Sequence, residues 1–386
     1  MSIRRFFSSC NRYLPVKKNT MNETIYLAAL NKIMTGNWKM AHELIFYFGS
    51  ASAVFNARQK ELSRLLPEID PAAFLSGEVI EDAAKELEYC QREGLEVLTI
   101  DDDAYPSRLA ETADAPLVIF KRGCRKLNGA RFLAIVGTRH CTPYARKNCD
   151  MIAEYMSSLK VKPVIVSGMA YGVDTMAHQA ALRYGLDTIA VTATGLDTVY
   201  PSSNRNLAPR IEERGAIVTE YWSGTPAYPF NFLSRNRIIA GLSDATVVVE
   251  SRIHGGSLVT AKAAFNYDRE VFTFPGKLED ECYAGCNMLI AENMAQLARS
   301  AQHIADGLGW YLPTGAEEKR SRQARFESLP FEKREILRAL RQCGEMDAAR
   351  IAACCSFDIT QTSFLLLEME IEGLVKHIST NKYVYL

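Results

Sequence analysis

The sequence predicts an α/β protein built on a doubly wound sheet, and three observations support this. Short, continuous apolar runs such as 132–136 and 164–166 are typical of strands buried on both faces. These runs alternate with helical stretches, as parallel βαβ units require. Glycine-rich turns follow the strands at 137–139 and 167–174. Such turns, with the helix N-termini behind them, collect anions at the carboxyl edge of a parallel sheet.

The sheet domain is expected over residues 131–310. Its strands share a short apolar run, and we place them at 132–136, 164–166, 188–192, 217–220, 246–250 and 271–274. Helices are predicted between them at 145–159, 177–184, 206–214, 237–242 and 258–267.

Other modules flank the sheet, because a chain of 386 residues is too long for one ordinary core. Residues 21–130 repeat apolar side chains at helical spacing, which predicts a helical, SAM-like module with one short strand. Residues 311–325 are a polar linker. Residues 326–386 are predicted to form three helices, 331–343, 347–355 and 358–373, and then two strands, 374–378 and 382–385. That pattern is winged-helix-like, and such modules bind duplex DNA or another protein.

Residues 1–20 form a basic extension without an acidic residue. Such a segment is either a transit peptide or a stretch that is not native, with the true start at Met21. We favour the second interpretation, because the remainder of the chain is typical of a bacterial cytoplasmic protein.

The composition limits the classes of partner. Lys+Arg and Asp+Glu both number 45, so the chain has no net field and any anion site must be a local patch. No apolar run approaches the roughly 20 residues that span a bilayer, so no membrane partner is expected. The 10 cysteines lack the spacing of a zinc site, which favours reduced thiols in the cytoplasm and no metal.

Several motifs of catalytic or cofactor-binding proteins are missing. The sequence contains no Gly-x-x-x-x-Gly-Lys-Ser/Thr, no Gly-x-Gly-x-x-Gly, no Gly-x-Ser-x-Gly and no His-Glu-x-x-His. We therefore predict no cofactor and no catalytic residue.

Polar side chains gather instead where the predicted strands end. Arg235-Asn236-Arg237 is expected just before a helix, where two guanidiniums would clamp phosphates. Several cations along one edge suit a polymer backbone better than one small phosphate. Tyr200, Tyr228, Phe230 and Phe232 are candidates for base stacking.

Other interpretations stay open for some of these residues. Asp174 is either part of the site or a cap of its helix, and His178 is better explained as a core residue than as a catalyst. Glu220 and Glu250 are expected to pair with the arginines. We therefore predict a structural rim of Asp174, Tyr200, Glu220 and Glu250.

The motifs in this order resemble the DNA-processing protein A (DprA/Smf) family over about residues 25–309. The resemblance rests on Gly137-Thr138-Arg139, the segment 167–174 with Ala177-His178, 195–201 with Asn204, 235–242, Val249-Glu250, 256–261, Pro275-Gly276 and 285–290. Residues 291–295 depart from the family pattern, which usually carries a Gly-Ala pair there.

The resemblance implies that the doubly wound sheet is an extended Rossmann-like domain. It also implies a cytoplasmic homodimer without established catalytic activity. It also implies binding of single-stranded DNA and transfer of that strand to the RecA recombinase during natural transformation. Together with our own additions from position, the DNA- or phosphate-binding set becomes Arg139, Ser167, Gly168, Arg235, Asn236, Arg237, Gly256, Ser257, Lys262, Lys277 and Asn287.

One alternative is a nucleotide-processing hydrolase of the lysine decarboxylase-like phosphoribohydrolase type. Those enzymes place a glutamate behind a Pro-Gly-Gly-x-Gly-Thr stretch. The corresponding stretch here, residues 254–260, is not followed by a glutamate at the equivalent position. Release of free base from nucleoside monophosphates would favour this alternative, and we expect no turnover.

Overall fold

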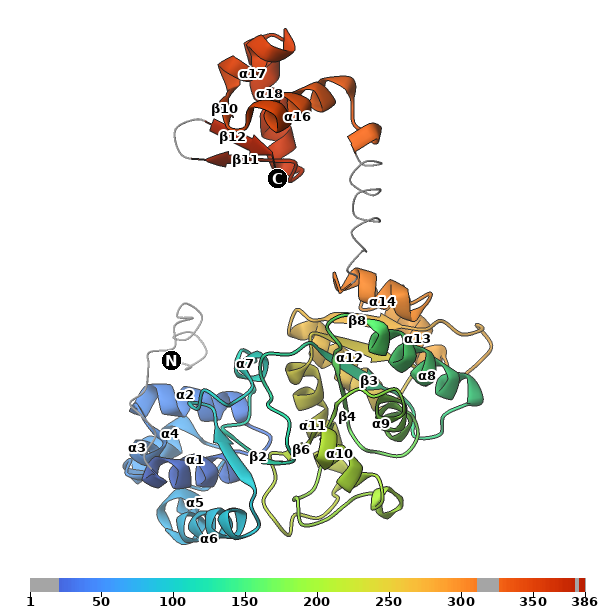
Figure 1. Cartoon of the computed structure of the whole chain (residues 1–386). Helices are drawn as coiled ribbons and strands as arrows, with labels where there is room; N and C mark the ends of the chain where they lie inside the picture. Colours follow the sequence, from blue (N-terminus) through green and yellow to red (C-terminus); the bar gives the residue numbers. More distant parts are fainter. Residues whose placement is uncertain (1–20, 311–325, 379–381, 386) are drawn as a thin grey trace. The chain divides into compact units, whose positions relative to one another are not determined.

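A nine-stranded sheet forms the centre of the first of two compact units, residues 1–311 and 312–386 (Figure 1). The structure is a computed structural model that describes residues 21–310, 326–378 and 382–385. The strands run in the order β1-β2-β6-β5-β4-β3-β7-β8-β9. The six central strands pair in parallel and are β3 (Phe132–Val136), β4 (Val164–Ser167), β5 (Thr188–Val191), β6 (Ala216–Thr219), β7 (Ala245–Val248) and β8 (Glu270–Thr273). The predicted Rossmann-like fold class is therefore confirmed.

The order of the chain reverses between β3 and β7, which pair directly although more than a hundred residues separate them. In a doubly wound sheet this switch point opens a crevice at the carboxyl ends of the strands. The turn after β3 at residues 137–139 and the turn after β7 at residues 249–251 therefore face the same crevice.

Three further strands lie at the edges of the sheet. β1 (Glu96–Thr99) and β2 (Val118–Arg122) pair antiparallel with each other, and β2 pairs antiparallel with β6. β9 (Gln296–Leu297) extends the other edge in parallel. β1 and β2 precede the domain boundary predicted near residue 130, yet they belong to the same sheet. The sequence pattern at 118–122 does not reveal this, because β2 finds its partner in a strand about a hundred residues later.

Helices cover both faces because alternate residues of each strand point to opposite sides. Leu133 and Ile135 pack with α8 (Pro143–Ser158), α9 (Val173–Arg183) and α14 (Ala301–Gly307). Phe132, Ala134 and Val136 pack with α11 (Pro229–Leu242), α12 (Ser257–Asn266) and α13 (Ala284–Ala291). α10 (Ala208–Arg214) precedes β6.

The second unit has a core of its own, formed mainly by Ile336, Leu340, Leu366 and Met369. Its helices are α16 (Phe331–Cys343), α17 (Ala348–Cys355) and α18 (Ile359–Ile371). Its sheet pairs β10 (Met346–Asp347), β12 (Lys382–Tyr385) and β11 (Val375–Ile378) in that order. The predicted three helices and two strands are present, and β10 adds a third, short strand. The predictions of a basic extension at 1–20 and a linker at 311–325 concern residues that lie outside the described ranges.

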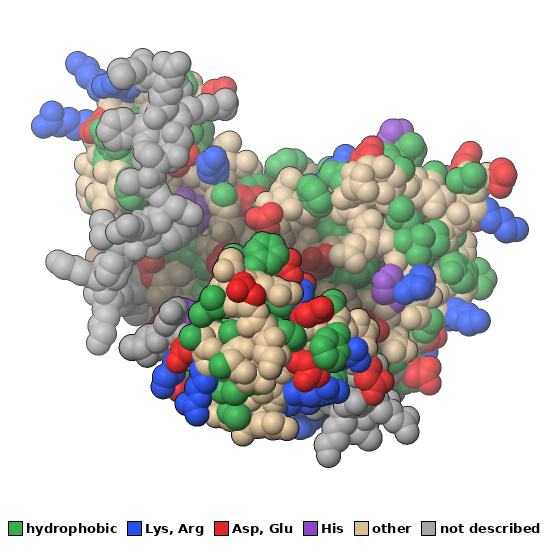
Figure 2. Space-filling view, turned by 90° about the horizontal axis from the view of Figure 1, so that it is seen from above, with side chains coloured by type: hydrophobic (Ala, Val, Ile, Leu, Met, Phe, Trp, Pro, Cys, Tyr) green, Lys and Arg blue, Asp and Glu red, His purple; other side chains and the backbone are tan. Residues whose placement is uncertain are grey.

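Charges of both signs are mixed on the face drawn in Figure 2, as the equal totals of 45 acidic and 45 basic residues suggest. A binding site for an anion must therefore come from local geometry. Among the described residues, no helix is long and apolar enough to cross a membrane.

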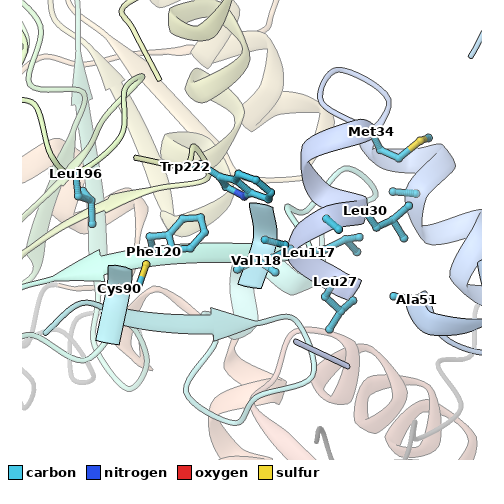
Figure 3. Packing of buried hydrophobic residues seen from close by; sticks show 14 of the residues in the cluster. Leu27, Leu30, Met34, Ala51, Cys90, Leu117, Val118, Phe120, Leu196 and Trp222 are labelled. Atoms are coloured by element: carbon cyan, nitrogen blue, oxygen red, sulfur yellow. The ribbon is translucent and has the colours of Figure 1, made fainter. Parts of the chain in front are cut away.

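The N-terminal helices share their core with the sheet. Leu27 and Leu30 of α1 (Met21–Ile33) belong to the same buried cluster as Val118 and Phe120 of β2 and Trp222 (Figure 3). The remaining helices of this module are α2 (Trp38–Phe48), α3 (Ala51–Phe55), α4 (Gln59–Leu65), α5 (Ala72–Leu75) and α6 (Glu78–Arg92), and the short α7 (Ser107–Ala110) precedes β2. This continuous core holds the helical module against the edge of the sheet at β2.

His178 of α9 is a core residue. It is fully buried, and its Nδ1 lies 2.7 Å from the Thr188 hydroxyl, which donates to the Ile165 carbonyl at 2.8 Å. The Thr188 proton is thus committed to Ile165, so His178 Nδ1 must be the donor. Burial lowers the pKa of His178 to about 3.

We expect His178 to make the folded state sensitive to acid. Between pH 6.5 and 3 the unfolded chain binds a proton at this residue and the folded chain does not. Stability therefore falls with decreasing pH, by about 1.4 kcal/mol per pH unit from this residue. Urea unfolding at pH 7, 6 and 5 gives the unfolding free energy at each pH. The slope of this free energy against pH should be smaller for His178→Gln than for the parent. His254→Gln, at an exposed position, is the control with the parental slope. Equal slopes for the parent and His178→Gln would contradict this assignment.

Candidate nucleic-acid interface

The arginines expected to clamp phosphates lie inside α11 rather than before it. The helix begins at Pro229, whose ring suits a first helical position, so Arg235, Asn236 and Arg237 fall in its second and third turns. All three are buried, with 2%, 9% and 6% of their surface exposed. The prediction that this motif precedes a helix is wrong, because the helix starts eight residues earlier than the predicted start at residue 237.

Arg235 joins the carboxyl ends of two strands. Its Nη1 donates to the Gly168 carbonyl, which follows β4, at 2.5 Å, and also to the Val191 carbonyl at the end of β5. Asp174 lies beside the guanidinium, and its Oδ2 accepts from the Ala170 amide at 3.3 Å. Burial raises the pKa of Asp174, and the positive charge of Arg235 opposes that shift. Arg235 is therefore a structural cation of the rim.

Gly168 is required by this packing. A Cβ at position 168 would lie 2.5 Å from the Asp174 carboxylate and 2.6 Å from the guanidinium nitrogens of Arg235. Ser167 is buried as well, and its hydroxyl donates to the Ile135 carbonyl at 2.6 Å. Both residues thus shape the turn after β4, and neither offers a free side-chain donor to a phosphate.

Arg237 faces the helical module. It forms a buried ion pair with Glu220, and its Cζ lies 3.7 Å from the centre of the Trp38 ring of α2. Burial raises the pKa of Glu220, and Arg237 opposes the shift. The phosphate contact expected for Arg237 does not fit this placement, because protein groups enclose the guanidinium. Sequence reasoning missed Trp38, whose position at the start of α2 gives no sign of its partner.

An exposed cation does lie at the rim, next to aromatic rings. The Cζ atom of Arg139 is 5.0 Å from the ring centre of Phe232, which is 5.2 Å from the ring centre of Tyr200. Tyr200 is 37% exposed and Tyr171 is 48% exposed. The amide of Val173 donates to the Thr138 carbonyl at 3.1 Å, which holds the turn carrying Tyr171 against the turn carrying Arg139. We call Arg139, Tyr171, Tyr200 and Phe232 the Arg139 platform.

Tyr171 did not appear among the residues predicted from the sequence. It stands between Gly168 and Gly172 in the turn after β4, and an aromatic residue in a glycine-rich turn is the only signal that marks it. Tyr200 was predicted for the rim and lies there.

Both lysines predicted for the site, Lys262 and Lys277, are exposed. Lys277 follows β8, and β3 and β8 are separated only by β7, so the ends of the two strands lie roughly 10 Å apart at the same edge. Lys262 is exposed on α12. Their contact with DNA stays a prediction.

The remaining predicted polar groups hold turns together. Asn287 accepts from the Gly276 amide and donates to its carbonyl, both at 3.1 Å. Asn236 donates to the Gly256 carbonyl at 3.1 Å, and the hydroxyl of Ser257 donates to that of Ser251 at 2.9 Å. These side chains place the loops, and phosphate would have to displace their partners.

Glu250 lies at the switch point and is fully buried. Its carboxylate accepts from the Thr142 hydroxyl at 2.5 Å, the Thr142 amide at 3.2 Å and the Tyr283 hydroxyl at 2.9 Å. These bonds join the turns after β3 and β7 to the start of α13. The predicted pairing of Glu250 with an arginine is wrong, because the described partners of its carboxylate are Thr142 and Tyr283. The described part of the chain contains no group of three His, Cys, Asp or Glu side chains placed to hold a metal ion.

A rigid rim with an exposed arginine beside aromatic rings can bind a phosphate chain and stack its bases. Fold and site together define a Rossmann-like protein with an exposed arginine and aromatic rings at the carboxyl edge of its sheet.

Comparisons with known proteins identify the family of this chain. The sequence matches the family described as DNA recombination-mediator protein A over residues 96–309, and it is 38% identical to the DNA processing protein DprA of Streptococcus pneumoniae across 61% of this chain and 81% of that protein. The chain therefore belongs to the DprA/Smf family. It is also 32% identical to a putative DNA processing protein DprA of Mycobacterium tuberculosis, across 77% of this chain and 79% of that one.

Solved structures show the same relationship. The crystal structure of DprA from S. pneumoniae matches with a TM-score of 0.63 and 31% identity, covering 75% of this chain and 98% of that chain. DNA processing protein A from Helicobacter pylori matches with a TM-score of 0.50 and 30% identity, covering 55% and 95%. The latter structure is described for its single-stranded DNA binding mode.

Replacing Arg237 should affect folding. In Arg237→Ala the Glu220 carboxylate stays buried without its partner, which costs about 3–5 kcal/mol of unfolding free energy. Urea unfolding at pH 7 measures the loss. Arg64→Ala, on the exposed surface of α4, should change stability by less than about 0.5 kcal/mol. An Arg237→Ala protein as stable as the Arg64→Ala control would show that the ion pair does not hold the module.

Proposed function

We propose that this protein binds single-stranded DNA at the Arg139 platform and performs no chemistry on it. The observation that carries the proposal is the exposed guanidinium of Arg139 at 5.0 Å from the Phe232 ring, with the Tyr200 ring tilted against Phe232 at 5.2 Å. A cation binds the phosphates of any sequence, and an aromatic face accepts any base. This combination favours an unpaired strand, whose bases are free to stack.

Two further features support the proposal. The H. pylori relative is described as a single-stranded DNA-binding protein, and this chain covers 95% of its length. Lys277 lies along the same edge of the sheet as Arg139, where it is placed to contact the backbone of a strand that runs along the rim.

We propose that the protein protects incoming DNA and loads RecA onto it during natural transformation, as a cytoplasmic homodimer. The membership of a recombination-mediator family supports this role.

The hydrolase alternative finds no support at the switch point. All hydrogen bonds described for the Glu250 carboxylate go to Thr142 and Tyr283, and the carboxylate is fully buried. A general acid or base must reach the proton that it transfers. We therefore assign Glu250 to the structure of the rim.

Two substitutions separate the phosphate and base contributions. Arg139→Ala should weaken binding to a 20-nucleotide oligothymidylate and lower the slope of log K against log salt by about 0.7, the value for one lost contact on a single strand. Phe232→Ala should weaken binding by about 1–3 kcal/mol and leave that slope unchanged. Fluorescence anisotropy at several salt concentrations measures both.

The matched control is Arg64→Ala, which removes an exposed arginine from α4. Its affinity and salt slope should equal those of the parent. If Arg139→Ala bound the oligonucleotide like this control, the Arg139 platform would not be the binding site.

A further inference from the structure

The turn between α1 and α2 lies along the start of α11. The Lys32 ammonium is 5.2 Å from the Trp222 ring centre, and the Trp38 ring is 3.7 Å from the Arg237 guanidinium. Between them, a Cβ built on Gly36 would lie 3.5 Å from Phe230. Three contacts therefore seat residues 32–38 of the helical module against residues 222–237.

This seam presents aromatic rings and cations on the surface. Tyr228 and Phe230, at the start of α11, are 59% and 56% exposed. Lys32 and Lys39 are exposed, and neither forms a salt bridge with a carboxylate in the described part of the chain. Glu43, one turn after Lys39 on α2, is likewise not paired with it there. Exposed aromatic rings and exposed cations thus occur in this region as well as in the Arg139 platform.

The two surfaces are close. Phe230 and Phe232 are two residues apart in one helical turn, so their side chains project about 200° apart around the axis. A helix with its side chains is about 10–12 Å wide. At the roughly 3.4 Å spacing of stacked bases, about three nucleotides bridge that width.

We propose that the single-strand site continues across the start of α11 onto the helical module, where Phe230 and Tyr228 stack bases and Lys39 and Lys32 bind phosphates. The ligand is a further segment of the same unpaired strand. This inference rests on the proposed function and adds to it a second contact region, supplied by a different part of the chain.

The test compares strand lengths in the full-length protein. A 4-nucleotide oligothymidylate fills the Arg139 platform alone, whereas a 20-nucleotide strand reaches both regions. Lys39→Glu should reduce the affinity for the longer strand and lower its salt slope by about 0.7. Phe230→Ala should weaken that binding roughly 5- to 150-fold. Both variants should bind the 4-nucleotide strand within about twofold of the parent, as judged by anisotropy at low salt.

Lys60→Glu, at an exposed lysine of α4 in the same module, is the matched control and should bind both strands like the parent. The extension is overturned if Lys39→Glu and Phe230→Ala bind the long strand with the affinity of the parent. It is also overturned if both variants lose the same affinity for the two strand lengths. Neither result would contradict binding at the Arg139 platform. A parent protein that binds neither strand would overturn the proposed function itself.

Discussion

The guanidinium of Arg235 is the group on which the geometry of the site depends. It comes from α11, and it ties the turn after β4 to the end of β5 through the carbonyls of Gly168 and Val191. Burying a charge is costly unless it is paired and hydrogen-bonded, and Asp174 with these carbonyls meets that condition. The turn formed by residues 168–173 is itself held by a hydrogen bond from the Val173 amide to the Thr138 carbonyl, next to Arg139. An interior cation thus positions the exposed one.

Helical geometry explains why two arginines occur two residues apart. Residues i and i+2 of an α-helix point about 200° apart, so Arg235 turns toward the strand ends while Arg237 turns toward α2. Arg237 pairs with Glu220 and stacks on Trp38, which locks the helical module to the sheet. One short motif therefore holds two interfaces, and the residues of α11 that are proposed to contact DNA precede the motif, at the start of the helix.

This arrangement also explains how the proposed DNA binding is compatible with a chain without net charge. With 45 basic and 45 acidic residues, attraction of a polyanion cannot come from a global field. Many arginines are already paired, among them Arg237 with Glu220 and Arg125 with Asp187. Exposed cations remain for a ligand, and one of them, Arg139, lies beside an aromatic ring, where a stacked base would add a contact that salt does not screen.

The alternation of strands and helices can be predicted from the sequence alone, because local apolar runs and glycine turns encode buried parallel strands. The predicted strand at 132–136 matches β3 residue for residue. The sequence also indicated the edge of the sheet that carries the site. It could not show that β2 joins that sheet, since the pairing of β2 with β6 spans about a hundred residues. The tertiary structure is needed to see which cations are buried among protein partners and which are exposed to solvent. The reason is physical: a guanidinium has the same donors in either setting, and its function depends on whether Asp174 and Glu220 or the solvent surrounds it.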